Sequence, residues 1–312
     1  MKKILFTGGG GAGNEALFRL LKDRYEMHFA DADLQAIDPA IPASQRHAVP
    51  FANDPVFADQ LCGLIKRYKI DLLVPGVDEE LLTVAKLAAD GKVAALLPPE
   101  RFVRRHLDKF YSMRFLNERK LAAPRTVLAA QAEMIGFPCI VKPRRGRGSR
   151  GVVQISSRKQ LDAYLAYTGG MDDWIAQEQG QGEEFTVMMA AAADGTLRAV
   201  VPVAVEVKRG ITLRAQTCRN REVEEACRKV HEADPVAGCY NIQLIRQADE
   251  RILIFEINPR VSTTLCLGVA AGVDPVAVFL EQSPDGNAAL LPFKEKLHLQ
   301  RNWVNHIQGV SV

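Results

Sequence analysis

The chain has 312 residues, which is enough for two or three domains that each have a hydrophobic core. Hydrophobic residues make up 47% and charged residues 25%, as in ordinary globular proteins, and the net charge of +3 is too small to indicate a nucleic-acid or membrane partner. The six cysteines form no CxxC pair and no stretch approaches about 18 apolar residues, so we expect a cytoplasmic protein with free thiols and no membrane span.

The amino-terminal part alternates between predicted strands and predicted helices. Strands are expected over residues 3–7, 28–33, 71–75 and 93–97, and helices over residues 15–23, 55–68 and 78–90. Such alternation is typical of a doubly wound parallel sheet with helices on both faces. Pro98 and Pro99 then interrupt the pattern, so we place the first domain at 1–98.

The rest of the chain is richer in strands. Helices are expected over 100–119, 159–167 and 221–233, and from Arg260 to about Leu280. Strands are expected over 138–142, 152–156, 174–178, 184–193, 197–207 and 240–257. We place a second domain at 99–180 and a third at 181–312, in which residues 281–312 have weak signals. The predicted fold class therefore combines an α/β part with an α+β part.

A glycine-rich turn follows the first predicted strand. Gly8, Gly10 and Gly13 have the spacing G-x-G-x-x-G, and Asp31 and Asp33 follow about twenty residues later. This pattern predicts an NAD(P)-binding oxidoreductase as one alternative. A turn of this kind also occurs in doubly wound domains that bind no nucleotide.

A second glycine-rich segment lies between two predicted strands of the second domain. Lys142 closes the first strand, and the loop 144–151 contains three glycines, one serine and four arginines. Glycines allow backbone N–H groups to approach phosphate oxygens, and the lysine adds a point charge. The segment therefore predicts a phosphate site. The alternatives are a solvated basic hairpin and an RNA contact, although an RNA contact would need aromatic stacking residues nearby.

Polar residues alternate with apolar ones near the end of the last long strand. Glu256, Asn258 and Arg260 are expected on one face, and Phe255 and Ile257 on the other. If residues 248–251 form a hairpin loop, residue 247 faces 252 and Gln243 faces Glu256, with Cβ atoms about 5 Å apart. Carboxylate and carboxamide oxygens suit Mg²⁺, so the pattern predicts a magnesium site. The alternative is a polar hairpin face in water.

The motifs, taken in order, resemble the ATP-grasp superfamily. Phe-Pro-x-Ile-Val-Lys-Pro with its glycine-rich loop (137–151) precedes Gln-Glu-x-x-x-Gly-Glu-Glu-Phe (177–185), then Asn-Ile-Gln (241–243) and Phe-Glu-Ile-Asn-Pro-Arg (255–260). The last two motifs most resemble carbamoyl-phosphate synthetase large subunits and their single-module relatives. The resemblance covers roughly residues 100–280 and implies a two-lobed ATP-grasp module behind an amino-terminal sheet domain.

The resemblance also implies roles for individual residues. Lys109 and Lys142 would contact ATP phosphates, the loop with Gly148 and Ser149 would close over them, and Lys208 would be a further phosphate ligand. The adenine would meet Glu178, Gln179 and Gly180, and the ribose would meet Glu184. One or two Mg²⁺ ions, or Mn²⁺ in their place, would be held by Gln243, Glu256 and Asn258. Arg260, and Lys142 again, would be catalytic residues.

The implied activity is an ATP-dependent ligase that joins a carboxylate to an amine or ammonia through an acyl phosphate. A carbamoyl-phosphate-synthetase-like phosphorylation of bicarbonate or carbamate is the near alternative. The expected partners are small molecules, without nucleic acid or membrane, and a homodimer is compatible with the sequence. Many ATP-grasp ligases have a carboxylate where this chain has Gln243, which leaves the metal site less negative.

Overall fold

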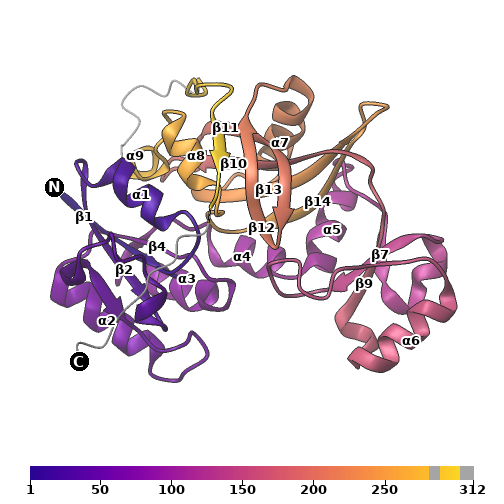
Figure 1. Ribbon diagram of the computed structural model, residues 1–312, viewed down its shortest axis with the longest axis horizontal. Coiled ribbons are helices and arrows are strands. Elements are labelled where there is room, and N and C mark those ends of the chain that lie inside the picture. The colour runs from indigo at the N-terminus through magenta and orange to yellow at the C-terminus, as the bar shows by residue number, and fades with distance from the viewer. Residues whose placement is uncertain (281–288, 303–312) are drawn as a thin grey trace, which may run out of the picture.

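The protein is described by a computed structural model that covers residues 1–280 and 289–302. Within these residues the strands form three sheets, which Figure 1 shows in a row. A parallel sheet lies at the amino-terminal end, a six-stranded antiparallel sheet lies in the middle, and a four-stranded antiparallel sheet lies at the far end. The predicted combination of α/β and α+β parts is confirmed.

The amino-terminal sheet has the strand order β3-β2-β1-β4-β5, and all its pairs are parallel. Its strands are β1 Lys2–Thr7, β2 Tyr25–Asp31, β3 Arg46–Ala48, β4 Leu72–Val74 and β5 Ala94–Ala95. Helix α1 (Asn14–Leu21) packs on the face of Ile4 and Phe6. Helices α2 (Phe57–Tyr68) and α3 (Leu81–Ala89) pack on the opposite face, because the side chains of a strand alternate.

The basic segment after this sheet forms two helices, so the single helix expected over 100–119 is wrong. Helix α4 is Glu100–His106 and helix α5 is Lys109–Glu118. Asp108 separates them because its backbone is extended and its carboxylate accepts a hydrogen bond from the N–H of Phe110 at 3.0 Å. The same carboxylate binds Arg144 at 2.8 Å, so the break ties α5 to the predicted phosphate loop.

The four-stranded sheet has the order β6-β9-β7-β8. Its strands are β6 Thr126–Leu128, β7 Cys139–Pro143, β8 Val153–Ile155 and β9 Trp174–Glu178. Helix α6 (Arg158–Thr168) packs on it through Leu161 and Leu165. The loop 144–151, which we call the arginine loop, connects β7 to β8 and lies beside the central sheet.

The six-stranded sheet has the order β14-β13-β10-β11-β12-β15. Its strands are β10 Gly182–Ala191, β11 Leu197–Arg209, β12 Ile211–Thr217, β13 Gly238–Gln247, β14 Ile252–Asn258 and β15 His298–Gln300. Helices α4, α5 and α7 (Arg221–Ala233) contribute to the core on one face. Helices α1, α8 (Leu265–Ala270) and α9 (Pro275–Leu280) contribute on the other. Strands β12 and β15 were not predicted from the sequence.

The β13–β14 hairpin pairs Gln243 with Glu256 as expected, but its loop end differs from the expected register. Ile252 pairs with Arg246 and not with residue 247, and a β-bulge then leaves Phe255 without a partner. The extra residue of the bulge restores the expected pairing at Gln243. It also turns Phe255 to the side of Glu256, so the expectation that these two residues face apart is wrong.

The three sheets occupy residues 2–95, 126–178 and 182–300, and the exact domain boundaries 1–98, 99–180 and 181–312 stay a prediction. Among the described residues, no helix is both long enough and apolar enough to cross a membrane.

Candidate active site

The predicted nucleotide residues line one cavity of about 510 Å³ between the four-stranded and six-stranded sheets. We call it the lysine cavity, because three lysines contribute to its wall. The predicted residues on this wall are Lys109, Lys142, Gly148, Ser149, Glu178, Gln179, Gly180, Glu184, Lys208, Gln243 and Glu256. They come from six separate segments of the chain, so the fold alone brings them together.

The three lysines meet around one carboxylate. Lys142 is only 5% exposed, and its Nζ donates to Gln177 Oε1 at 2.8 Å. Lys109 Nζ lies 3.1 Å from Glu256 Oε1. Lys208 donates to Gln243 Oε1 at 2.9 Å and pairs with Glu184. The cluster is therefore positively charged overall, as a site for a polyphosphate should be.

Burial and mutual repulsion perturb these groups. Burial lowers the pKa of Lys142 to about 8, although the neighbouring Glu256 raises it and Lys109 and Lys208 lower it further. Burial by itself raises the pKa of Glu256, but the three lysines outweigh this and bring the pKa below its usual value. Glu256 is therefore ionised at neutral pH, and Lys142 is close to the point at which it loses its proton.

The other wall of the lysine cavity is apolar and suits a flat ring. It includes Ile140, Ile245, Leu253 and Phe255, next to the backbone that leaves β9 at Glu178. A Cβ atom on Gly180 would lie 3.1 Å from Ile245 and 3.2 Å from Leu253, so glycine keeps the chain close to this wall. The Glu178 carboxylate accepts a hydrogen bond from the Arg125 N–H at 3.2 Å.

The arginine loop covers one side of the lysine cavity. Gly146, Gly148 and Ser149 have left-handed φ angles of 117°, 69° and 57°, so the tight bend requires glycine or a tolerant residue. Lys109 Nζ donates to the backbone oxygen of Gly146 at 2.7 Å, which holds the loop near the lysine cluster.

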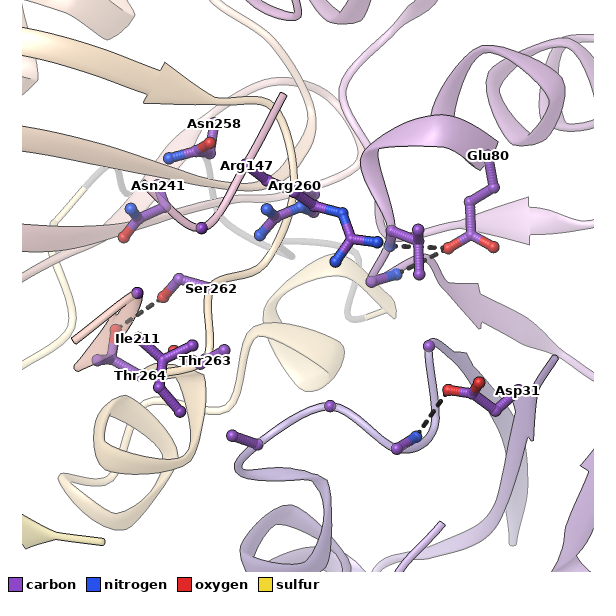
Figure 2. A pocket seen from close by; sticks show the side chains of 18 of the residues that line it. Asp31, Glu80, Arg147, Ile211, Asn241, Asn258, Arg260, Ser262, Thr263 and Thr264 are labelled. Atoms are coloured by element: carbon purple, nitrogen blue, oxygen red, sulfur yellow. Dashed lines mark hydrogen bonds between the residues drawn. The ribbon is translucent and has the colours of Figure 1, made fainter. Parts of the chain in front are cut away.

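A second cavity of about 480 Å³ adjoins the first. We call it the glycine-turn cavity, because Gly8, Gly10 and Gly11 line it on the side of the amino-terminal sheet. Asn258 and Arg260 line this cavity and not the first one, as Figure 2 shows together with Asn241. The two cavities share their wall at Arg147, Gly148, Glu184, Lys208, Gly210, Gln243 and Glu256.

Contacts from the first domain hold the far side of the glycine-turn cavity. Arg260 pairs with Asp78, and its Nη1 donates to the backbone oxygen of Val261 at 2.9 Å. Asp31 accepts a hydrogen bond from the Gly10 N–H at 2.9 Å, drawn as a dashed line in Figure 2. Glu80 is 2% exposed, and burial raises its pKa to about 7 against the hydrogen bonds that it accepts.

The predicted metal ligands are adjacent in part. Gln243 Nε2 donates to Glu256 Oε2 at 2.9 Å, and Asn258 follows two residues later along β14. The described residues contain no cluster of three or more His, Cys, Asp or Glu side chains that could hold a metal ion. The three predicted ligands thus offer one carboxylate and two carboxamides. This set fits a magnesium ion that also takes oxygens from bound phosphates, because Mg²⁺ commonly uses one or two protein carboxylates in such sites.

Sequence reasoning missed several residues that the fold adds to the two cavities. Asn241 precedes Gln243 by two positions, so strand periodicity could have placed it on the same face. Gln177 begins the motif 177–185, and it is buried and accepts a hydrogen bond from Lys142. Arg147 lines both cavities and pairs with Glu79 of a distant segment, a contact for which the sequence gives no signal. Asp78 lies outside the cavity walls but pairs with Arg260, which lines the glycine-turn cavity.

Comparison with known proteins identifies the family. The family model of the ATP-grasp domain matches residues 107–264, which is half of the chain. The chain is 24% identical over 290 residues to a formate-dependent phosphoribosylglycinamide formyltransferase of Bacteroides fragilis, and the match covers 83% of this chain and 71% of that protein.

Two solved structures show the same fold. An N5-carboxyaminoimidazole synthase of Aspergillus clavatus, in complex with ADP and 5-aminoimidazole ribonucleotide, matches with a TM-score of 0.71 and 17% identity, over 93% of this chain and 79% of that one. An L-amino acid ligase of Bacillus licheniformis matches with a TM-score of 0.68 and 16% identity, over 94% and 78%. The predictions of the superfamily and of an enzyme are confirmed: the chain belongs to the ATP-grasp family.

Proposed function

We propose that the chain is an ATP- and Mg²⁺-dependent ligase that joins a carboxylate to an amine or ammonia through an acyl phosphate. The observation that carries this proposal is the shared wall of the two cavities. The lysine cavity suits a nucleotide, the glycine-turn cavity can hold a second molecule, and Glu256, Gln243 and Lys208 belong to both. A phosphoryl group bound at that wall could therefore pass from one cavity to the other.

The nucleotide would lie with its base against the apolar wall of the lysine cavity. The backbone at Gln179 and Gly180 borders that wall, and Glu184 lines the same cavity and pairs with Lys208. The phosphates would then meet Lys109, Lys142 and Lys208, each of which would donate to phosphate oxygens. The arginine loop, including Gly148 and Ser149, would exclude water from the phosphates.

The chemistry follows from charge. An oxygen of the carboxylate attacks the terminal phosphorus of ATP, ADP leaves, and an acyl phosphate forms. The amine then attacks the acyl carbon, phosphate leaves with the bonding electrons, and the nitrogen loses a proton. Lys142 and Arg260 would offset the charge on the moving phosphoryl group, so positioning and electrostatics supply the catalysis.

Magnesium would be held by Glu256 with the oxygens of Asn258 and Gln243. When bound, the ion would act as a Lewis acid that offsets the negative charge of the phosphates. A carboxamide binds a metal through its oxygen, so the ion would compete with Lys208 Nζ for Gln243 Oε1. One carboxylate suits one ion better than two, and Mn²⁺ could take its place.

The relatives guide the choice of substrates to test. Their names include formate and phosphoribosylglycinamide for one relative and an L-amino acid for another, so small acids and amines of several sizes belong in the test. Phosphorylation of bicarbonate would use the same shared wall, and a cavity of about 480 Å³ leaves room for an amine beside so small an acid.

We do not propose the oxidoreductase, because the glycine turn has a packing explanation. A Cβ atom on Gly10 would lie 2.5 Å from the Cβ of Ala36, and the Gly10 N–H already donates to Asp31. Glycine at position 10 therefore allows close contact with Ala36 inside the protein, and its N–H is not free for a bound dinucleotide.

The test is a phosphate-release screen at fixed Mg-ATP, in which formate, bicarbonate and a set of carboxylic acids are crossed with ammonia, amino acids and amino-sugar phosphates. A pair that releases ADP and phosphate and yields a coupled product supports the ligase. The Glu256→Ala variant should be inactive with that pair. If it retained the activity of the parent chain, the assignment of the shared wall would be wrong. Tight NADH binding by the parent chain would instead favour the oxidoreductase.

A further inference from the structure

Three consecutive acidic residues, Asp78, Glu79 and Glu80, each hold a different part of the molecule. We propose that this acidic turn is a latch that couples closure of the arginine loop to the state of the glycine-turn cavity. Its members are positioning residues, because they act through Arg147 and Arg260 and touch no reacting atom.

Glu80 fixes the turn to the amino-terminal sheet. Its Oε1 accepts hydrogen bonds from Thr7 Oγ1 at 2.6 Å and from the N–H groups of Gly76 and Val77, both at 3.0 Å. Thr7 ends β1, and Gly76 and Val77 follow β4, so one carboxylate joins the carboxyl ends of two neighbouring strands. Figure 2 shows the two bonds from backbone N–H groups as dashed lines that meet at Glu80.

Asp78 reaches the carboxyl end of β14 in the six-stranded sheet. It pairs with Arg260, and both side chains are largely buried, at 15% and 13% exposure. Arg260 lies two residues beyond Asn258, and Figure 2 shows its side chain extending toward the loop that Glu80 binds. This ion pair therefore connects the amino-terminal domain to the end of β14, the strand that carries Glu256 of the shared wall.

Glu79 reaches the arginine loop. Its Oε2 accepts from Arg147 Nε at 3.2 Å, and Arg147 lines both cavities. This pair is half-exposed, at 54% for Glu79 and 40% for Arg147, so it can shift an equilibrium between open and closed loops without locking either state. An opening loop needs such a weak contact, because the nucleotide must enter and leave.

The coupling follows from what lines the glycine-turn cavity. Gly76, Val77 and Glu80 belong to its wall. Val77 also packs closely against the glycine turn, because a Cβ atom added to Gly8 would lie 2.7 Å from Val77 Cγ2. A molecule bound there would contact the turn that carries Glu79. Loop closure over the phosphates would then depend on whether the second cavity is filled. This consequence rests on the proposed function, whereas the latch itself does not.

Trypsin tests the latch in the protein without ligands. The arginine loop offers cleavage sites after Arg145 and Arg150, and an open loop is cut faster than a closed one. We expect Glu79→Gln to speed cleavage at these two sites about two- to fivefold, measured from fragment masses over time. The matched control is Glu118→Gln, which removes an ion pair of similar exposure, 58%, within α5. This control should be cut at the parent rate.

A charge exchange makes the test specific. Arg147→Glu places two carboxylates next to each other. Adding Glu79→Arg restores a pair of opposite charges, and the loop sequence of this double variant is the same as that of Arg147→Glu alone. The double variant should be cut more slowly at Arg145 and Arg150 than Arg147→Glu alone. If Glu79→Gln behaves as Glu118→Gln does, or if the double variant gains no protection, the latch is refuted.

The coupling has its own readout. With a substrate pair found in the phosphate-release screen, the parent chain should release one phosphate per product, and Glu79→Gln should release more than one. Equal ratios in the two proteins would refute the coupling. A screen that finds no substrate would count against the proposed ligase and leave the trypsin result standing, so the two failures can be told apart.

Discussion

The ammonium group of Lys142 lies 3.1 Å from the backbone oxygen of Phe255, which joins β7 of the four-stranded sheet to β14 of the six-stranded sheet. Phe255 is the unpaired residue of the β-bulge, and the Lys142 Nζ also lies 5.4 Å from the centre of its ring. The contact crosses the lysine cavity at the point where we place the phosphates. Lys142 therefore links the two sheets while it remains available to an anion.

The pKa of Lys142 predicts an alkaline limit for the reaction. Because burial lowers this pKa to about 8, the free protein loses the ammonium charge as the pH rises through 8. Only the charged form attracts phosphate oxygens, so kcat/KM for ATP should fall above about pH 8, by up to tenfold per pH unit. Initial rates at low ATP between pH 6.5 and 9.5 check this. Lys142→Arg should move the fall to higher pH, since guanidinium stays charged. A flat profile in the parent chain would contradict the assignment.

Glu256 should be needed for turnover and for the charge state of its neighbours. Glu256→Gln keeps the shape of the side chain but removes the carboxylate among three lysines, so we expect ATP turnover to fall at least about a hundredfold. Thermal unfolding should still be cooperative. Because the Glu256 charge raises the pKa of Lys142, its loss should lower that pKa further. Chemical modification of Lys142 at pH 7.5, followed by mass spectrometry, should become faster. Unchanged reactivity would show that the two groups do not interact.

Local pattern was enough to predict the Gln243–Glu256 pair, although it missed the bulge. The alternation of side chains and the position of the turn fix the face on which a side chain lies. The expected pairing at the loop end was shifted by one residue, and the extra residue of the bulge, Phe255, cancels this shift before Gln243. Most of the other residues that line the lysine cavity were expected there from the resemblance to the ATP-grasp superfamily. Many of the residues of this cavity lie within strands or in the loops that follow them, whereas Lys109 begins α5.

Contacts between distant segments were not predictable in this way. Asp78 and Arg260 are separated by 182 positions, and Glu79 and Arg147 by 68. Neither pair has a sequence periodicity, because each depends on how the amino-terminal sheet docks on the other two. The break between α4 and α5 at Asp108 has one local cause and one distant cause. The carboxylate of Asp108 caps α5 locally, but its ion pair with Arg144 forms only in the folded protein and cannot be read from the sequence.

Glu80 should make stability depend on pH. Its pKa is about 7 in the folded state and close to 4.5 when unfolded, so the folded state binds the proton more tightly. Its contribution to stability is fully present below about pH 4.5 and is lost as the pH rises through 7. Glu80→Gln can still accept from Thr7, Gly76 and Val77 without the buried charge. We expect this variant to gain up to about 3 kcal/mol relative to the parent at pH 8, and much less at pH 5. Urea unfolding at both pH values checks this, and an equal effect at both would contradict it.

A final prediction concerns the packing of the glycine turn. Gly10→Ala would place a methyl group 2.5 Å from the side chain of Ala36 and 3.0 Å from its backbone, so something must shift. We expect a loss of about 1–3 kcal/mol in the free energy of unfolding, as for other overpacked sites. Gly63→Ala is the matched control, because Gly63 lies inside α2 with nothing within 4 Å of its new methyl group. It should stabilise the protein by about 0.5–1 kcal/mol through helix propensity. Urea unfolding measures both changes. If Gly10→Ala were as stable as the parent chain, packing would not explain this glycine, and the approach of a ligand to the turn would become the better explanation.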